Sequence, residues 1–241
     1  FIPNLPKDYR SLLGTPRQSV LRTVAPGKYT HIGIEKNIEE IFKSNKLNSD
    51  IENLLLDLFI DGVKIFDISS EKSFWVILGR LKEIEKFIFP IGFYNGSSQP
   101  YNFNDLLADT VLELKKLKND GIMINGIKIK VILRNILSDS PAHASLSGIK
   151  HPTGYSACPY CNVNGRRFKG RMVFPETDCL RRTKINFLER IDPEHHVRDS
   201  VLEELDIDIV WQLPLDYLHS VLLGVQKKML RILFHSDQPL L

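Results

Sequence analysis

The residues best suited to carry chemistry lie within one stretch, residues 131–165. An apolar run from Val131 leads to Asp139, and a Cys-x-x-Cys pair, Cys158 and Cys161, begins nineteen residues after that acid. A carboxylate at the end of a strand can hold a divalent cation, and two cysteines at this spacing can supply half of a zinc site. The stretch therefore contains two incomplete sites, and other parts of the chain must supply the remaining ligands.

Asp61 is the candidate partner of Asp139. It follows an apolar run at 54–60, with a turn expected near Gly62. Two carboxylates held together can bind Mg²⁺ or Mn²⁺, and a pair of such ions can activate a water or a 3′-hydroxyl at a phosphodiester. Simpler interpretations remain open: Asp61 as a turn acid, and Asp139 as a helix cap. Asp57 has the same strand parity as Asp61, so it competes for the same role.

The elements that position these acids follow from the hydrophobic pattern. It predicts three strands, a helix and a fourth strand, in this order: 54–60, 73–81, 87–96, 103–118 and 127–137. Ligands gather at strand ends in open α/β sheets, so the acids meet if the first and fourth strands are neighbours. This order is typical of a ribonuclease-H-like mixed sheet, and we expect that α/β fold.

The chain divides into three regions. Residues 1–48 are a basic, proline-rich arm with a short amphipathic helix at 34–47, and residues 49–150 are the expected ribonuclease-H-like core. Residues 151–241 hold the Cys-x-x-Cys pair, a run of cations and apolar stripes with helical spacing. We expect this last region to be a mostly helical insertion associated with zinc.

Composition limits the class of protein. The chain has 241 residues, of which 43% are hydrophobic and 25% are charged, so a packed core is expected rather than disorder. No apolar run reaches the about 18 residues of a membrane span, so we expect no membrane partner. The net charge of +3 is compatible with nucleic acid binding. The chain begins at Phe1 without a start methionine, and we interpret it as a fragment.

A zinc site needs four ligands, and the sequence does not complete one around Cys158 and Cys161. Two reduced, half-buried thiols on a loop are the alternative, and a redox pair is less expected because no strand-to-helix junction carries it. The further candidate ligands are Cys179, His143, His151, His195, His196, His219 and His235.

A basic segment follows the cysteine pair. Such a run is usually a solvated surface, but beside a two-acid site it becomes a candidate for contact with the DNA backbone. Its seven cations are Arg166, Arg167, Lys169, Arg171, Arg181, Arg182 and Lys184.

Five segments, in order along nearly the whole chain, resemble the transposase domain-containing proteins of arthropods and other animals. That family belongs with the eukaryotic DDE/D cut-and-paste transposases. The segments are LPKDYRSLLGTPR (5–17), FIDGVKIFDISSEKSFWVILG (59–79), FPIGFYNG (89–96), ILSDSPAHASLSGIKHPTGYSACPYC (136–161) and LPLDYLHSVLLGVQKKML (213–230).

The resemblance implies a catalytic role for two acids. Asp61 matches the first catalytic acid of the family, in a DG step, and Asp139 matches the second, in a D-[AS]-P-A step. Together they would hold Mg²⁺ or Mn²⁺ for two-ion chemistry. The family's third acid has no convincing match here, and we expect it beyond Leu241. This chain is therefore expected to be an incomplete catalytic domain.

The resemblance also implies a structural Zn²⁺ ion. Cys158 and Cys161 match the Cys-x-x-Cys that follows the second acid, and His219 matches the Leu-His element that supplies zinc ligands in related transposases. The second histidine that usually follows is replaced in this window by Leu223 and Gly224. The fourth ligand therefore stays open.

The function implied is cleavage and transfer of DNA strands by the intact parent protein. The partner would be double-stranded DNA at transposon ends, the location would be the nucleus, and a homodimer is a compatible assembly. One alternative is a non-catalytic, domesticated DNA- or protein-binding module that keeps the transposase fold. Another is an unrelated, zinc-stabilised α/β domain with no role in DNA chemistry.

Overall fold

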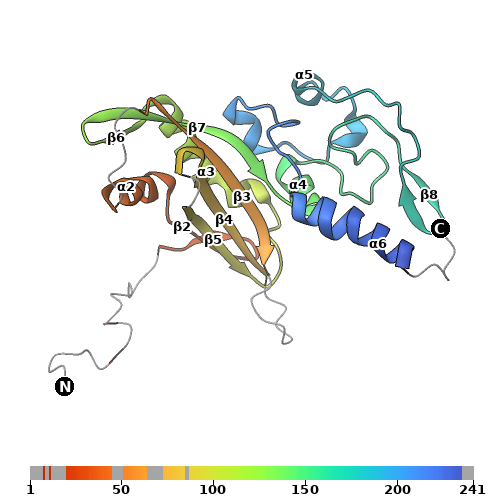
Figure 1. Ribbon diagram of the computed structural model, residues 1–241, viewed down its shortest axis with the longest axis horizontal. Coiled ribbons are helices and arrows are strands. Elements are labelled where there is room, and N and C mark those ends of the chain that lie inside the picture. The colour runs from red at the N-terminus through yellow and green to blue at the C-terminus, as the bar shows by residue number, and fades with distance from the viewer. Residues whose placement is uncertain are drawn as a thin grey trace.

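The protein has a mixed α/β fold, seen in a computed structural model. Figure 1 shows a twisted sheet at the left with α2 and α3 beside it, and a less regular region at the right with α4, α5 and α6. The residues that the structure describes are Asp8, Ser11, 20–44, 51–63, 73–84 and 87–234.

The main sheet has seven strands, and its centre is built from long, buried strands. In spatial order they are β1 (Arg22–Val24), β2 (Gly27–His31), β5 (Ile88–Gly96), β4 (Ser73–Leu81), β3 (Asn53–Val63), β7 (Ile127–Leu137) and β6 (Ile122–Ile124).

The connections between these strands decide the arrangement of the sheet. β3, β4 and β5 form an antiparallel meander, and the chain then crosses through α3 (Phe103–Asn119). It returns by way of β6 to β7, which lies parallel to β3. The first and fourth strands of the expected order are therefore neighbours, which is the condition for their two acids to meet. The predicted strand at 73–81 is confirmed, with the same bounds.

α3 forms because its apolar residues recur at helical spacing and its start is capped. The Asn102 side chain accepts the backbone N–H of Asn104 at 3.0 Å, which satisfies one of the free donors of the first turn. The buried face of α3 packs on the sheet and belongs to the main core. Its buried residues are Phe103, Leu106, Leu107, Thr110, Val111, Leu114 and Leu117.

The turn expected at Gly62 is not present, because β3 continues through it. Gly62 pairs with Trp75 on β4, and Val63 pairs with Phe74. A Cβ atom at Gly62 would lie 3.1 Å from the Trp75 ring, so the missing side chain makes room for the indole. A glycine within a strand can mark such a close approach instead of a turn.

Residues 22–31, which we grouped with a basic arm, form two strands of the main sheet. β2 pairs antiparallel with β5, and α2 (Ile34–Ser44) packs beside α3. Gly92 of β5 leaves space for the Tyr29 side chain, whose hydroxyl would collide with an added Cβ. Arg10 and Arg17 of the expected arm lie outside the described residues.

The region after β7 is mostly loops and short turns, not the helical insertion expected. Among its described residues, only 218–234 form a long helix, in which a π-helical segment leads into α6. The remaining elements are η1 (Lys82–Ile84), α4 (Ser140–Ser147), β8 (Arg166–Phe168), β9 (Arg171–Val173), α5 (Lys184–Leu188), η2 (Pro193–His195), η3 (Val201–Leu205), η4 (Leu218–Gln226) and α6 (Lys227–Phe234).

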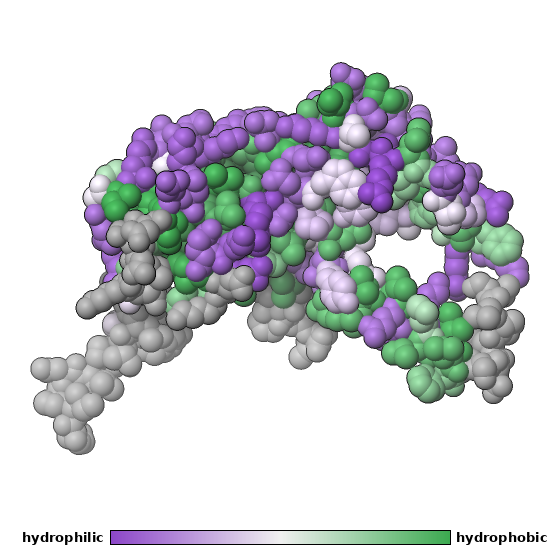
Figure 2. Space-filling model, turned by 45° about the horizontal axis from the view of Figure 1, so that its top comes forward, coloured by the Kyte–Doolittle hydropathy of each residue, from purple (hydrophilic) through white to green (hydrophobic). Residues whose placement is uncertain are grey.

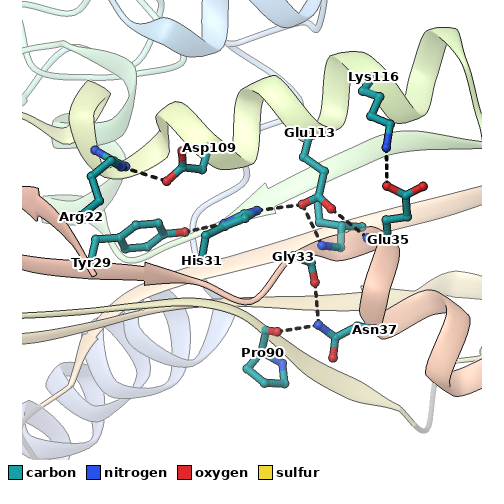
Figure 3. Close-up of polar contacts among 11 residues, drawn as sticks. Arg22, Tyr29, His31, Gly33, Glu35, Asn37, Pro90, Asp109, Glu113 and Lys116 are labelled. Atoms are coloured by element: carbon teal, nitrogen blue, oxygen red, sulfur yellow. Dashed lines mark hydrogen bonds and ion pairs between the residues drawn. The ribbon is translucent and has the colours of Figure 1, made fainter. Parts of the chain in front are cut away.

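Glu113 of α3 joins the sheet to the start of α2 (Figure 3). Its carboxylate accepts the backbone N–H groups of Ile34 at 2.7 Å and Glu35 at 2.9 Å, and it contacts His31 Nε2 at 2.9 Å. The Tyr29 hydroxyl lies 3.0 Å from His31 Nδ1. A carboxylate at this position also complements the positive end of the α2 dipole.

The environment of Glu113 favours its charged form. Burial alone raises the pKa of the carboxyl, but the hydrogen bonds from His31, Glu35 and Ile34 outweigh it, so the pKa lies below its ordinary value. A carboxyl with a lowered pKa in the folded state stabilises the fold above its unfolded pKa. That contribution is lost as the pH falls through the lowered value.

We predict that Glu113→Gln lowers the free energy of unfolding by about 1–3 kcal/mol at neutral pH, because it removes a partly buried charge that accepts several hydrogen bonds. The difference from the wild type shrinks in acid, where Glu113 itself becomes protonated. Urea denaturation at both pH values measures this effect. Glu39→Gln, which loses only an exposed pair with Lys43, is the control. An equal loss for Glu113→Gln at both pH values contradicts the prediction.

Candidate acidic site

Asp61 and Asp139 lie at the same end of neighbouring parallel strands. The last residue pair between β3 and β7 is Phe59 with Leu137, and each acid lies two residues further along its own strand direction. Parallel strands end at the same edge of a sheet, so this register brings the two candidate acids together. The structure thus groups the two residues that the sequence selected.

The pKa of the Asp61 carboxyl lies above its ordinary value, in part because of the neighbouring acids. Burial raises it, repulsion from Asp139 and Asp216 raises it further, and the Gly62 N–H and His219 lower it in part. The Asp61 carboxylate accepts the Gly62 N–H at 2.7 Å. The net result is a carboxyl with a raised pKa beside two other acids, and perturbed groups of this kind concentrate at functional sites.

Asp216 is the acid that the sequence reasoning missed. Leu215 forms a parallel bridge with Ser138, and the Asp216 N–H donates to the Ser138 carbonyl at 2.8 Å. This backbone pairing places Asp216 beside Asp139, although 77 positions separate them along the chain. The available signal was the Asp-x-x-His spacing, which puts Asp216 and His219 on one helical turn.

His219 belongs to the same group. Its Nδ1 lies 2.6 Å from Asp216 Oδ2, and its backbone N–H donates to the same oxygen at 3.0 Å. The resemblance assigned His219 to zinc with Cys158 and Cys161. Within the described part of the chain no three His, Cys, Asp or Glu side chains form a group ready to hold a metal.

Asp139 is also a helix cap, as the simpler interpretation expected. Its Oδ1 accepts the Ala142 N–H at 2.8 Å at the start of α4. The α4 N-terminus therefore fixes one carboxylate oxygen. A cap and a cation ligand are compatible roles, because a carboxylate accepts at two oxygens.

Asp57 does not share this environment. It is 1% exposed and directly opposite Arg80 on β4, and its carboxylate binds Arg80, Arg134 and Asn135. Burial raises its pKa, but these partners outweigh burial and hold the pKa below its ordinary value. Its charge is thus compensated inside the fold, which leaves Asp61 as the candidate on β3.

The cysteine pair has the geometry of two ligands of one ion. Cys158 Sγ and Cys161 Sγ lie 3.4 Å apart, as free thiols. Two thiolates each about 2.3 Å from a tetrahedral zinc ion lie roughly 3.8 Å apart, so a small movement of either side chain would let both thiols hold one ion. Burial raises the pKa of the Cys158 thiol, against the N–H groups of Tyr160 and Cys161 that lower it.

The seven cations of the basic segment divide into three groups. Arg182 is 7% exposed and paired with Asp192, and Lys184 is paired with Asp206, so both contribute to the fold. Arg181 lies over the Trp211 ring at 5.8 Å. The other cations, which form no ion pair with a described residue, lie on the exposed hairpin β8–β9: Arg166, Arg167, Lys169 and Arg171.

Comparisons with known proteins do not identify the chain. No protein-family model matches it, and a search of curated proteins finds no significant match. Among the described residues no helix is long and apolar enough to cross a membrane. The functional argument therefore depends on the site itself.

We predict that Asp61→Asn raises the Tm by a few degrees at neutral pH without divalent cations, because the amide removes a charge that burial, Asp139 and Asp216 disfavour. A carboxyl with a raised pKa stabilises the fold only while protonated, so the variant's advantage shrinks in acid. Differential scanning calorimetry measures both effects, with the exposed Asp199→Asn as the control. A lower Tm for Asp61→Asn at neutral pH contradicts the prediction.

Proposed function

We propose that the protein carries out metal-ion-dependent cleavage and transfer of DNA strands, in the manner of a DDE/D transposase. The observation that carries the proposal is the convergence of Asp61 and Asp139 at the carboxyl ends of the adjacent parallel strands β3 and β7. Ligands in open α/β sheets bind at such strand ends.

The order of elements supports a ribonuclease-H-like core. An antiparallel meander, a crossing helix and a strand parallel to the first strand follow one another as β3, β4, β5, α3 and β7, with only the short β6 hairpin strand before the last. This is the arrangement expected from the resemblance to eukaryotic DDE/D transposases. The fold alone does not specify an activity, so the acids have to carry the functional argument.

The donor set suits Mg²⁺ or Mn²⁺. Asp61 and Asp139 offer hard carboxylate oxygens, and a divalent cation would relieve the repulsion that Asp139 and Asp216 exert on Asp61. Such ions, when bound, activate an attacking oxygen and stabilise a leaving oxygen at a phosphodiester. Asp216 holds Nδ1 of His219, which keeps the imidazole oriented beside the acids. A His–Asp pair in this position can accept or release a proton.

Double-stranded DNA is the proposed substrate, bound as transposon ends in the nucleus. The hairpin β8–β9 offers exposed cations on a short ribbon, and its turn is formed by Lys169 and Gly170 with φ of 48° and 79°. Cations of this kind contact phosphates without reading the sequence.

A non-catalytic DNA- or protein-binding module is the second candidate. The observation that favours it is the helix 218–234, in which no residue is buried although many are apolar. Figure 2 shows this apolar surface at the lower right. Exposed apolar surface of this extent marks an interaction site.

We predict that the chain binds Mn²⁺ and that Asp61→Asn or Asp139→Asn abolishes this binding in isothermal titration calorimetry. Asn also caps helices well, so Asp139→Asn keeps the start of α4 and isolates the loss of charge. Asp199→Asn is the control, because its exposed carboxylate lies in a surface pair with Arg190. Mn²⁺ binding that survives both active-site changes contradicts the proposal.

The same variants separate catalysis from binding. The intact parent protein is expected to nick supercoiled plasmid DNA in the presence of Mn²⁺, and Asp139→Asn in that protein is expected to reduce nicking to background. Absence of nicking by an intact parent protein that binds both Mn²⁺ and DNA would favour the non-catalytic module.

We predict that charge reversal on the hairpin, Arg167→Glu with Lys169→Glu, weakens binding to duplex DNA. The logarithm of the DNA association constant decreases with the logarithm of the salt concentration. The steepness of this decrease is reduced by about 0.9 for each phosphate that the variant no longer neutralises. Fluorescence anisotropy at several salt concentrations measures it. Lys36→Glu with Lys43→Glu on α2 is the matched control, since it changes the net charge equally at exposed positions. Equal weakening by the two pairs contradicts a role for the hairpin.

A further inference from the structure

A second segment of the chain lies against the cysteine pair. The Asn162 N–H donates to the Leu180 carbonyl at 3.0 Å, and the Arg182 N–H donates to the Tyr160 carbonyl at 2.9 Å. These bonds form an antiparallel bridge between Cys161 and Arg181. A short stretch of ladder thus connects the Cys-x-x-Cys loop with residues 180–182.

This ladder places Cys179 near the pair. Cys179 lies two residues before Arg181, the bridge partner of Cys161, so it occupies the diagonal position. Diagonal neighbours lie on the same face of an antiparallel pair, with Cβ atoms within roughly 7–8 Å. The Cys161 thiol also contributes to raising the pKa of Cys179, after burial, which agrees with this proximity.

The pair itself is arranged as a metal-binding loop. The N–H groups of Tyr160 and Cys161 point to Cys158 Sγ, and Cys161 Sγ lies 3.4 Å from it. The buried Arg182 donates to the Cys158 carbonyl at 3.1 Å and to the Ser156 hydroxyl, which holds the loop in place.

We propose that Cys158, Cys161 and Cys179 are three thiolate ligands of one structural zinc ion, and that His219 is not a ligand of it. Three cysteines leave one position of a tetrahedral site, as in the known Cys₃His type. The carboxylate of Glu176, 3.9 Å from Cys179 Sγ, is a charged donor close enough to take that position. The three thiols do not form a closed group among the described residues, so binding of zinc by all three would require the exposed loop before Leu180 to move towards Cys158 and Cys161.

The role of such an ion follows from where its ligands lie. Residues 156–182 are mostly loop, and the described elements among them are only the strands β8 and β9. Zinc would connect the two ends of this stretch and fix the base of the basic hairpin. Structural zinc sites contribute directly to folding free energy.

Titration of the full chain with Co²⁺ tests the proposal. Co²⁺ bound to thiolates gives a sulfur-to-cobalt charge-transfer band that grows with the number of thiolates, whereas Co²⁺ on carboxylates gives none. The wild type is expected to bind one Co²⁺ at the thiols, with three-thiolate intensity in the charge-transfer band, and Zn²⁺ is expected to displace it. Cys179→Ser is expected to lose about a third of that intensity. Its affinity falls at least roughly tenfold, since even outer partners of zinc ligands contribute about 10–100-fold.

His219→Ala is the decisive comparison, because the resemblance assigns zinc to that residue. It is expected to keep the wild-type band, as is Asp139→Asn, so the result is independent of the DNA chemistry proposed above. Circular dichroism of the metal-free variants shows whether each is folded, and Cys179→Ala provides a second substitution. Loss of intensity in His219→Ala but not in either Cys179 variant overturns the proposal. So does a wild-type chain that binds Co²⁺ with no thiolate band.

Discussion

The parallel pairing of β3 with β7 is the constraint on which the rest of the structure depends. A parallel neighbour cannot be reached by a tight turn, so the chain must cross the sheet, and α3 makes that crossing. The crossing buries the apolar face of α3 against the same strands and brings both strands to an end at one edge. Packing of the core and placement of Asp61 and Asp139 therefore have one cause. Displacing α3 would deprive the core of a long buried helix face and the acids of their common position.

The two acids of β3, Asp57 and Asp61, are of the same residue type but have different surroundings. Asp57 and Asp61 have the same strand parity, but Asp57 has Arg80 directly across from it on β4 and Arg134 within reach on β7. Its charge is neutralised by the protein, although burying an ionic cluster carries a desolvation penalty. Asp61 has acids as neighbours instead. Burial and these acids raise its pKa, so its charged form is unfavourable in the folded protein. Carboxyl groups with perturbed pKa values of this kind are concentrated at functional sites.

Local pattern predicted the central strands and the crossing helix well, but not the contacts that explain single residues. The strand at 73–81 and the helix near 103–118 were visible because aromatic and branched runs and helical periodicity act within a few residues. Gly62 was misinterpreted as a turn because the reason for it is the Trp75 ring on another strand. Asp216 was missed for a similar reason: only the bridge from Leu215 to Ser138 reveals where it lies. Long-range backbone pairing is not encoded in any short window.

The bridge between Ser138 and Leu215 also affects how far the length of the region between them can change. Residues 139–214 leave the sheet and return to the point of departure, so their two ends are tied together next to the acids. The entropy of closing such a loop grows only with the logarithm of its length, and doubling the loop costs about 0.6 kcal/mol. Residues 139–214 could therefore become longer or shorter, or form new contacts, during evolution, while Asp139 and Asp216 at the two ends kept their relative positions.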